Sequence, residues 1–182
     1  LKNEECHGAE ITQLEKAIYT LDKQLREIDQ AIGSGGLALQ EARNIQKTLR
    51  DARGLGVLDA AGGGVAATAV KHKKINEARR QSDALRSRIS QFNSELTDVN
   101  IGFHLGQDDV SGFLRFADFF LDGLLADWAV QMRIGDYQQE IAGVESSLRS
   151  MVTRLEQMSR TMQHERYKLK EQQKLLVLGT KS

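Results

Sequence analysis

Five polar side chains in two separate segments have types and spacings that could form a chemical site. Lys71 and His72 follow Thr68 by three and four residues, so a helix places all three on one face. Asp118 and Asp122 are four residues apart and also share a face if helical. Where the two faces meet, a carboxylate would orient the imidazole, join a metal site with further ligands, or make a structural hydrogen bond.

The structural hydrogen bond is the interpretation we favour for this cluster. Catalysis needs a nucleophile or a substrate pocket as well, and the sequence supplies neither. The other three histidines are isolated, and the single cysteine, Cys6, provides no Cys-rich zinc site. A phosphate loop is also excluded, because Lys71 lies about two helical turns beyond Gly64 instead of directly after the glycines. We therefore expect no enzyme activity, no cofactor and no metal.

An aromatic segment, residues 113–132, is the second unusual feature. As a helix it is apolar around most of its circumference, which is typical of a helix buried in a bundle or placed against lipid. Arg115 and three aspartates interrupt it, and each central charge costs about 2.5–3.5 kcal/mol in a membrane, so spanning is disfavoured and lipid contact is an alternative. The residues of this packing or lipid patch are Phe116, Phe119, Phe120 and Trp128.

Long coiled-coil helices are predicted to position these segments. Apolar residues recur at alternating spacings of three and four in 10–32, 65–99 and 134–176, which keeps one stripe of each helix facing a partner. The stripes are Ile11, Leu14, Ile18, Leu21, Leu25, Ile28 and Ile32; then Ile75, Ala78, Ser82, Leu85, Ile89, Phe92, Leu96 and Val99; then Ile134, Tyr137, Ile141, Val144, Leu148, Met151, Leu155, Met158 and Met162.

Glycines mark the expected ends of helices in a chain without proline. The run Gly-Ser-Gly-Gly at 33–36 predicts a turn that ends the first helix, and a second helix follows at 37–53. The glycine-rich residues 54–64 predict a bend or a closely packed junction. With the aromatic helix at 113–132, the expectation is one all-α domain over 1–182, an antiparallel coiled-coil bundle of about five helices with a compact centre rich in glycine and aromatic residues.

Charge predicts which helices pair. Residues 1–32 hold seven acids and four bases, and residues 149–174 hold seven bases and three acids, so the first and last helices should attract. The acids beside the first stripe also complement bases beside the 65–99 stripe, although solvated helix faces would give the same pattern. The acids are Glu15, Asp22 and Asp29, and the bases are Lys74, Arg79, Arg86 and Arg88.

Two motifs resemble those of a group of bacterial coiled-coil proteins known as hypothetical proteins. The resemblance covers about residues 57–137 and implies a bacterial origin and an all-helical form, without an activity. Leu121 stands where the group favours phenylalanine, and the tryptophan expected before the glycines is missing. The matching residues are Ala67, Thr68, Lys71, His72, Lys74 and Ile75, then Phe116, Ala117, Asp118, Asp122, Leu124, Asp127 and Trp128.

Composition limits the function classes. The chain has 40% hydrophobic and 27% charged residues, enough for a core, and its zero net charge argues against a nucleic-acid partner even though residues 71–88 form a basic stripe. One cysteine and no secretory segment at the start favour the cytoplasm. The leading hypothesis is a structural or protein-interaction scaffold whose partner is a second copy, as a homodimer, or another helical protein. Peripheral membrane association through 113–132 is the alternative.

Overall fold

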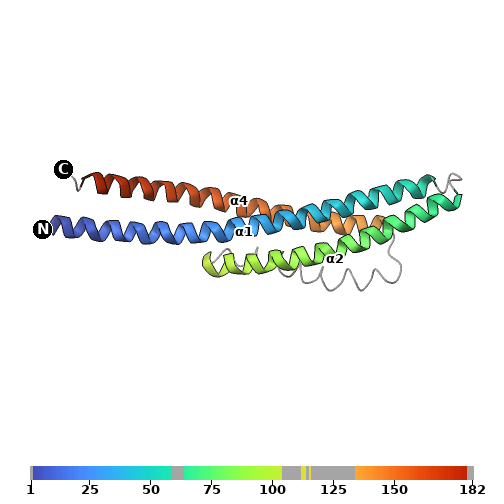
Figure 1. Cartoon of the computed structure of the whole chain (residues 1–182), viewed down its shortest axis with the longest axis horizontal. Coiled ribbons are helices and arrows are strands. Elements are labelled where there is room, and N and C mark those ends of the chain that lie inside the picture. The colour runs from blue at the N-terminus through green and yellow to red at the C-terminus, as the bar shows by residue number, and fades with distance from the viewer. Residues whose placement is uncertain (1, 59–63, 104–111, 114, 116–133, 180–182) are drawn as a thin grey trace.

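Three long α-helices make up most of the described chain (Figure 1). The structure is a computed structural model that describes residues 2–58, 64–103, 112–113, 115 and 134–179. The helices are α1 (Lys2–Leu58), α2 (Gly64–Phe103) and α4 (Ile134–Gly179). The predicted all-α bundle is confirmed, but it consists of three long helices instead of five.

The helix end predicted at residues 33–36 is wrong, because α1 continues through the Gly-Ser-Gly-Gly run without a break. Segments 10–32 and 37–53 are therefore parts of one helix. Gly35 does not form a turn; it allows side chains of the neighbouring helices to approach the α1 backbone closely. A Cβ atom added there would lie 2.7 Å from Val152 Cγ2 and 2.9 Å from the Phe92 ring, so α2 and α4 pack against bare backbone at this point.

The first and last helices run antiparallel in a strict heptad register, which confirms the pairing predicted from charge. Asp22 makes a 2.7 Å ion pair with Arg166. Seven residues earlier Glu15 accepts a hydrogen bond from Gln173, and seven residues later Asp29 accepts one from Ser159. Equal steps of seven on both helices keep the two stripes in contact along their length. The three acids thus meet α4, and not the bases of 65–99.

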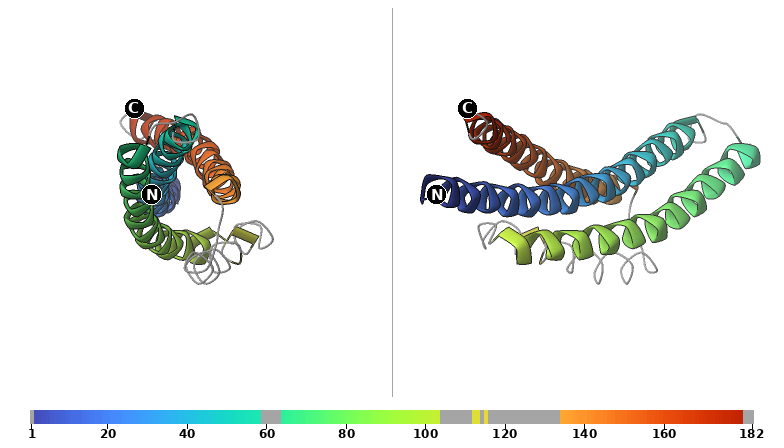
Figure 2. Two further views of the ribbon diagram at one scale, coloured as in Figure 1. Left: turned by 90° about the vertical axis from the view of Figure 1, so that its right-hand side faces the viewer. Right: turned by 60° about the vertical axis from the view of Figure 1, so that its left-hand side comes forward.

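The other long helix, α2, also packs antiparallel along α1. Lys74 near its start lies 4.0 Å from Asp51 near the end of α1. In the two views of Figure 2, α1 lies between α2 and α4. The largest buried side chains come from all three helices: Ile28, Ile45, Leu49, Leu85, Ile89, Phe92, Leu96, Tyr137, Ile141, Leu148 and Leu155.

The helices differ in extent, and this divides the molecule into two parts. Counting back from the Lys74–Asp51 pair, the end of α2 at Phe103 falls about level with Asp22 of α1. Beyond that point α1 and α4 are the only described helices that continue, toward the end where both termini lie (Figure 1). We call residues 8–24 and 163–179 the two-helix arm and the rest of the packed helices the three-helix body. No described helix has a stretch long and apolar enough to cross a membrane.

Candidate functional site

The predicted polar cluster is described only in part. Thr68, Lys71 and His72 all lie in α2, and the His72 side chain is exposed. Asp118 and Asp122 lie outside the described residues, so the predicted contact of an aspartate with His72 stays a prediction. Within the described ranges, no group of three or more His, Cys, Asp or Glu side chains is arranged to hold a metal ion.

The aromatic patch also falls mostly outside the described part of the chain, which does not include Phe116, Phe119, Phe120 or Trp128. The first residue of the aromatic segment, Phe113, is described and is buried in the core. Its ring meets the Phe92 ring edge-on, with centroids 5.3 Å apart and planes at 68°. At this one residue the segment packs inside the bundle, as an aromatic core pair does.

A buried polar contact joins α2 to α4. The Ser82 hydroxyl donates a 2.7 Å hydrogen bond to the Ala78 carbonyl, and the Tyr137 hydroxyl donates to Ser82 Oγ. Burial raises the pKa of Tyr137 to about 12, because the phenolate form would lose its hydration. The tyrosine is thus a neutral structural group at ordinary pH. Serine at this stripe position also has a specific partner, beyond being a small residue beside Ala78.

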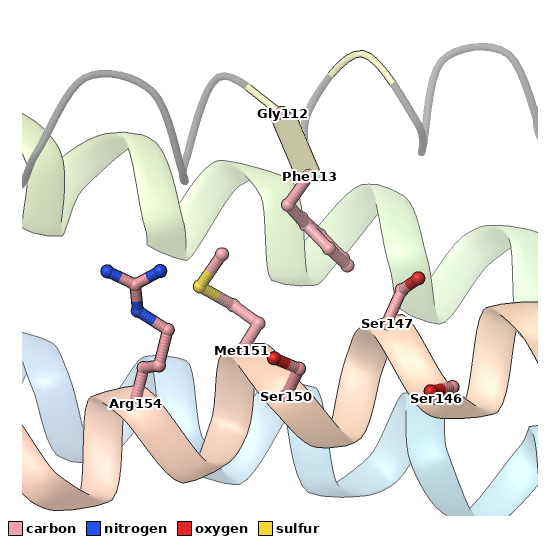
Figure 3. A pocket seen from close by; sticks show the side chains of 7 residues that line it. All are labelled: Gly112, Phe113, Ser146, Ser147, Ser150, Met151 and Arg154. Carbon is pink, nitrogen blue, oxygen red and sulfur yellow. The ribbon is translucent and has the colours of Figure 1, made fainter.

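One pocket of about 320 Å³ lies where Phe113 faces α4 (Figure 3). Figure 3 shows Met151 and Arg154 pointing from α4 toward the segment that carries Phe113. The described lining has hydroxyls and one guanidinium but no histidine or carboxylate that would activate a serine as a nucleophile. Its residues are Gly112, Phe113, Ser146, Ser147, Ser150, Met151 and Arg154.

A larger open groove of about 580 Å³ lies on the two-helix arm. Its walls are two helix faces, one from each end of the chain, and its lining is mainly apolar. Leu175 is 67% exposed at the groove, and Leu178 at the next turn is 55% exposed. The lining residues are Glu10, Gln13, Leu14 and Ala17 of α1 and Gln172, Leu175 and Leu176 of α4. We call this surface the arm groove.

The α1 wall of the arm groove continues the flank that α2 covers in the body. Glu10 and Ala17 are exposed. The equivalent positions in the body are Ala31, Ala38, Ile45 and Ala52, each a whole number of heptads further along α1 and each fully buried. This flank is the one toward α2, because Glu15 and Asp22, which reach α4, lie on the other side of the stripe.

The α4 wall shows the same change of environment. Tyr137, whose hydroxyl meets Ser82 of α2, begins a heptad series that continues through Val144 and Met151, all buried. The same series reaches Glu165 and Gln172 in the arm, where both are exposed. Both walls therefore belong to faces that meet α2 in the body, and no described helix covers these faces in the arm.

Sequence reasoning did not single out the arm groove. The predicted apolar stripe of the last helix ends at Met162, so it includes neither Leu175 nor Leu178. The sequence contains a partial signal, because the helix predicted at 134–176 is longer than the one predicted at 65–99. That the first helix is longer than 65–99 as well follows only from the structure, where α1 spans Lys2–Leu58.

The fold and the groove define the class of protein: an all-α antiparallel three-helix bundle extended by a two-helix coiled-coil arm. No protein-family model, no curated protein and no solved structure matches the chain. The resemblance of two motifs to bacterial coiled-coil proteins therefore stays a prediction.

Proposed function

We propose that this protein is a protein-interaction scaffold that binds a helix of its partner in the arm groove. The observation that supports this most directly is the groove itself, an apolar surface between two helices whose equivalent faces in the body are covered by α2. A helix laid into a groove of this kind presents apolar residues at spacings of three and four to the walls.

The energetic gain is concentrated in a few side chains. Burying one leucine side chain contributes about 1.5–3 kcal/mol, and Leu175 and Leu178 are both more than half exposed in the isolated chain. Gln13 and Gln172 line the groove beside them and can hydrogen-bond at its rim. This division into an apolar floor and a polar rim is typical of binding surfaces. No chemical step is part of the proposed function.

The test compares two glutamate substitutions at exposed positions. Leu175→Glu places a charge in the groove, whereas Tyr19→Glu places one on a residue of α1 that is 69% exposed and does not line the groove. Partners captured from the source cells are identified, purified and titrated against each variant. We expect the native chain and Tyr19→Glu to bind a helical partner equally and Leu175→Glu to bind at least about tenfold more weakly.

Helix content and thermal stability, measured by circular dichroism, must be the same for both variants, since both substituted side chains are exposed. The proposed function is wrong if Leu175→Glu binds every purified partner, including the chain itself, as tightly as the native chain does.

A further inference from the structure

We propose that the end of the molecule where α1 and α2 form a hairpin docks on an anionic lipid surface. The apolar tip of the hairpin enters the surface to headgroup depth, and exposed bases behind the tip bind the phosphate and carboxylate groups of the lipids. This end lies opposite the arm groove (Figure 1), and the inference does not depend on the proposed function. The described tip consists of residues 54–58 of α1 and 64–70 of α2.

The tip is poor in charge. Asp59, which lies outside the described residues, is the single charged residue between Arg53 and Lys71 in the sequence. Val70, directly before Lys71, is 45% exposed. The tip thus presents apolar surface and carries no base of its own.

The described part of α4 does not reach the tip. Gln46 of α1 donates a 2.7 Å hydrogen bond to the Gln138 carbonyl, so α4, which begins at Ile134, starts about level with Arg50. Beyond that level α1 and α2 are the only described helices, and Figure 1 shows them extending past the start of α4. The hairpin therefore projects from the three-helix body.

Exposed bases follow the tip on both helices. On α1, Arg53 is exposed although it is the heptad equivalent of Leu25 and Leu39, which are buried in the body. On α2, Lys73 and Arg80 are one heptad apart on an exposed face. We call the following exposed bases the basic collar: Lys47, Arg50, Arg53, Lys73 and Arg80.

Charge at this end of the molecule is unbalanced. Residues 47–80 hold eight bases and three acids, in a chain whose bases and acids are equal in number. Two of those acids, Asp51 and Glu77, lie 4.0 Å and 3.1 Å from the same base, Lys74, which is not part of the collar. The hairpin end is therefore positive, and it attracts an anionic surface.

The distance from the bases to the end of the tip matches the depth of the headgroup region. Leu58, at the end of α1, is five residues beyond Arg53, and Gly64, at the start of α2, is seven residues from Lys71. At a rise of about 1.5 Å per residue these distances are about 8 and 10 Å. Apolar surfaces of interfacial helices are buried about 5–10 Å deep, with bases at the level of the anionic headgroups.

The same residues fit a lipid surface better than a nucleic acid. An apolar segment between two groups of bases matches a surface that is anionic outside and apolar beneath, and a nucleic acid has no apolar layer for the tip. Residues 47–80 contain no phenylalanine, tyrosine or tryptophan on which bases could stack.

The first measurement is co-sedimentation of the purified chain with vesicles of phosphatidylcholine alone and of phosphatidylcholine and phosphatidylserine in equal parts. We expect binding only to the vesicles with phosphatidylserine, weakened by added salt. Arg53→Gln combined with Lys73→Gln should weaken it at least about tenfold. The matched control, Arg160→Gln combined with Lys168→Gln, removes the same two charges from exposed positions far from the hairpin and should bind as the native chain does.

Circular dichroism checks that both double variants keep the native helix content. The inference is overturned if the native chain does not bind the phosphatidylserine vesicles, or if both double variants bind them equally. Retention on DNA without binding to vesicles also overturns it. Leu175→Glu should bind vesicles as the native chain does, so this test and that of the arm groove fail separately.

The second measurement tests whether the tip contacts lipid. In a Cys6→Ser background, Val70→Cys and Tyr19→Cys are each labelled with a fluorophore whose emission depends on the polarity around it. On phosphatidylserine vesicles the emission should shift to the blue for the label at position 70 and stay unchanged for the label at position 19 on the arm. A vesicle-bound chain whose label at position 70 does not shift contradicts the proposed entry of the tip.

Discussion

Three glycines within four residues of α1 have different environments. An added Cβ at Gly35 would meet Phe92 and Val152 at 2.7–2.9 Å, whereas at Gly33 and Gly36 it would meet nothing within 4 Å. Glycine in a helix interior costs about 0.5–1 kcal/mol relative to alanine, through the entropy of the unfolded chain. That cost is offset only at Gly35, where the missing side chain lets α2 and α4 approach the backbone.

We therefore predict opposite effects of the same substitution at neighbouring positions. Gly36→Ala should raise the free energy of unfolding by up to about 1 kcal/mol, because it improves helix propensity in open space. Gly35→Ala should lower it by about 1–3 kcal/mol, because Phe92 and Val152 must move. Urea denaturation followed by circular dichroism gives both values, with Gly33→Ala as a second exposed control. A stabilising effect of Gly35→Ala would contradict the close packing described for this point.

At the scale of helices, a hydrogen bond between Ser82 and Tyr137 joins α2 to α4 inside the bundle. Tyr137 is fully buried, and its hydroxyl reaches Ser82 across the bundle. A buried hydrogen bond of this kind contributes about 1 kcal/mol net, and it is lost if either helix shifts along the other. Leucine packing alone tolerates such a shift by a heptad, so the polar pair favours one alignment.

This contact predicts a pH dependence with a definite sign. The folded state holds the pKa of Tyr137 at about 12, above the ordinary value of 10.0. The group therefore contributes stability that is fully present below pH 10 and is lost as the pH rises toward 12, by about 3 kcal/mol in all. Urea denaturation of the native chain and of Tyr137→Phe between those limits isolates this part, because other titrating groups are common to both.

The stability difference between the native chain and Tyr137→Phe should shrink steadily above pH 10. Parallel pH profiles for the two proteins would show that Tyr137 is not protected in the folded state. Tyr19→Phe serves as the control, because Tyr19 is exposed and should leave the profile of the native chain unchanged.

At the scale of the whole molecule, the arm and the body differ in how much surface they bury. Ile11, Leu14, Leu169 and Leu176 in the arm are only half-buried, whereas the corresponding stripe in the body is almost fully buried. Local opening requires less free energy where fewer apolar contacts are broken. The arm is thus the less stable part of an isolated chain and the part that gains most from a partner.

Hydrogen exchange should show this difference directly. In dilute solution, amides of residues 8–24 and 163–179 should exchange at least about tenfold faster than those of residues 28–52. Equal protection of arm and body would contradict the division described above.

The sequence by itself determined the helical class and the pairing of the first and last helices. Heptad spacing is a local property of the sequence. The opposite net charges of residues 1–32 and 149–174 predicted the pairing, and the Asp22–Arg166 ion pair is part of it in the structure. The bounds of the helices at 64–103 and 134–179 also follow closely from the apolar stripes.

Tertiary structure alone decided whether α1 continues through 33–36 and which stripe is left uncovered. Glycine in a helix is unfavourable locally, and only contacts with Phe92 and Val152, remote in sequence, compensate for it. The arm groove likewise depends on where α2 ends relative to α1 and α4, which is a relation between helices. The local spacing of apolar residues specifies each helix, but whether a helix face is buried depends on which other helix packs against it.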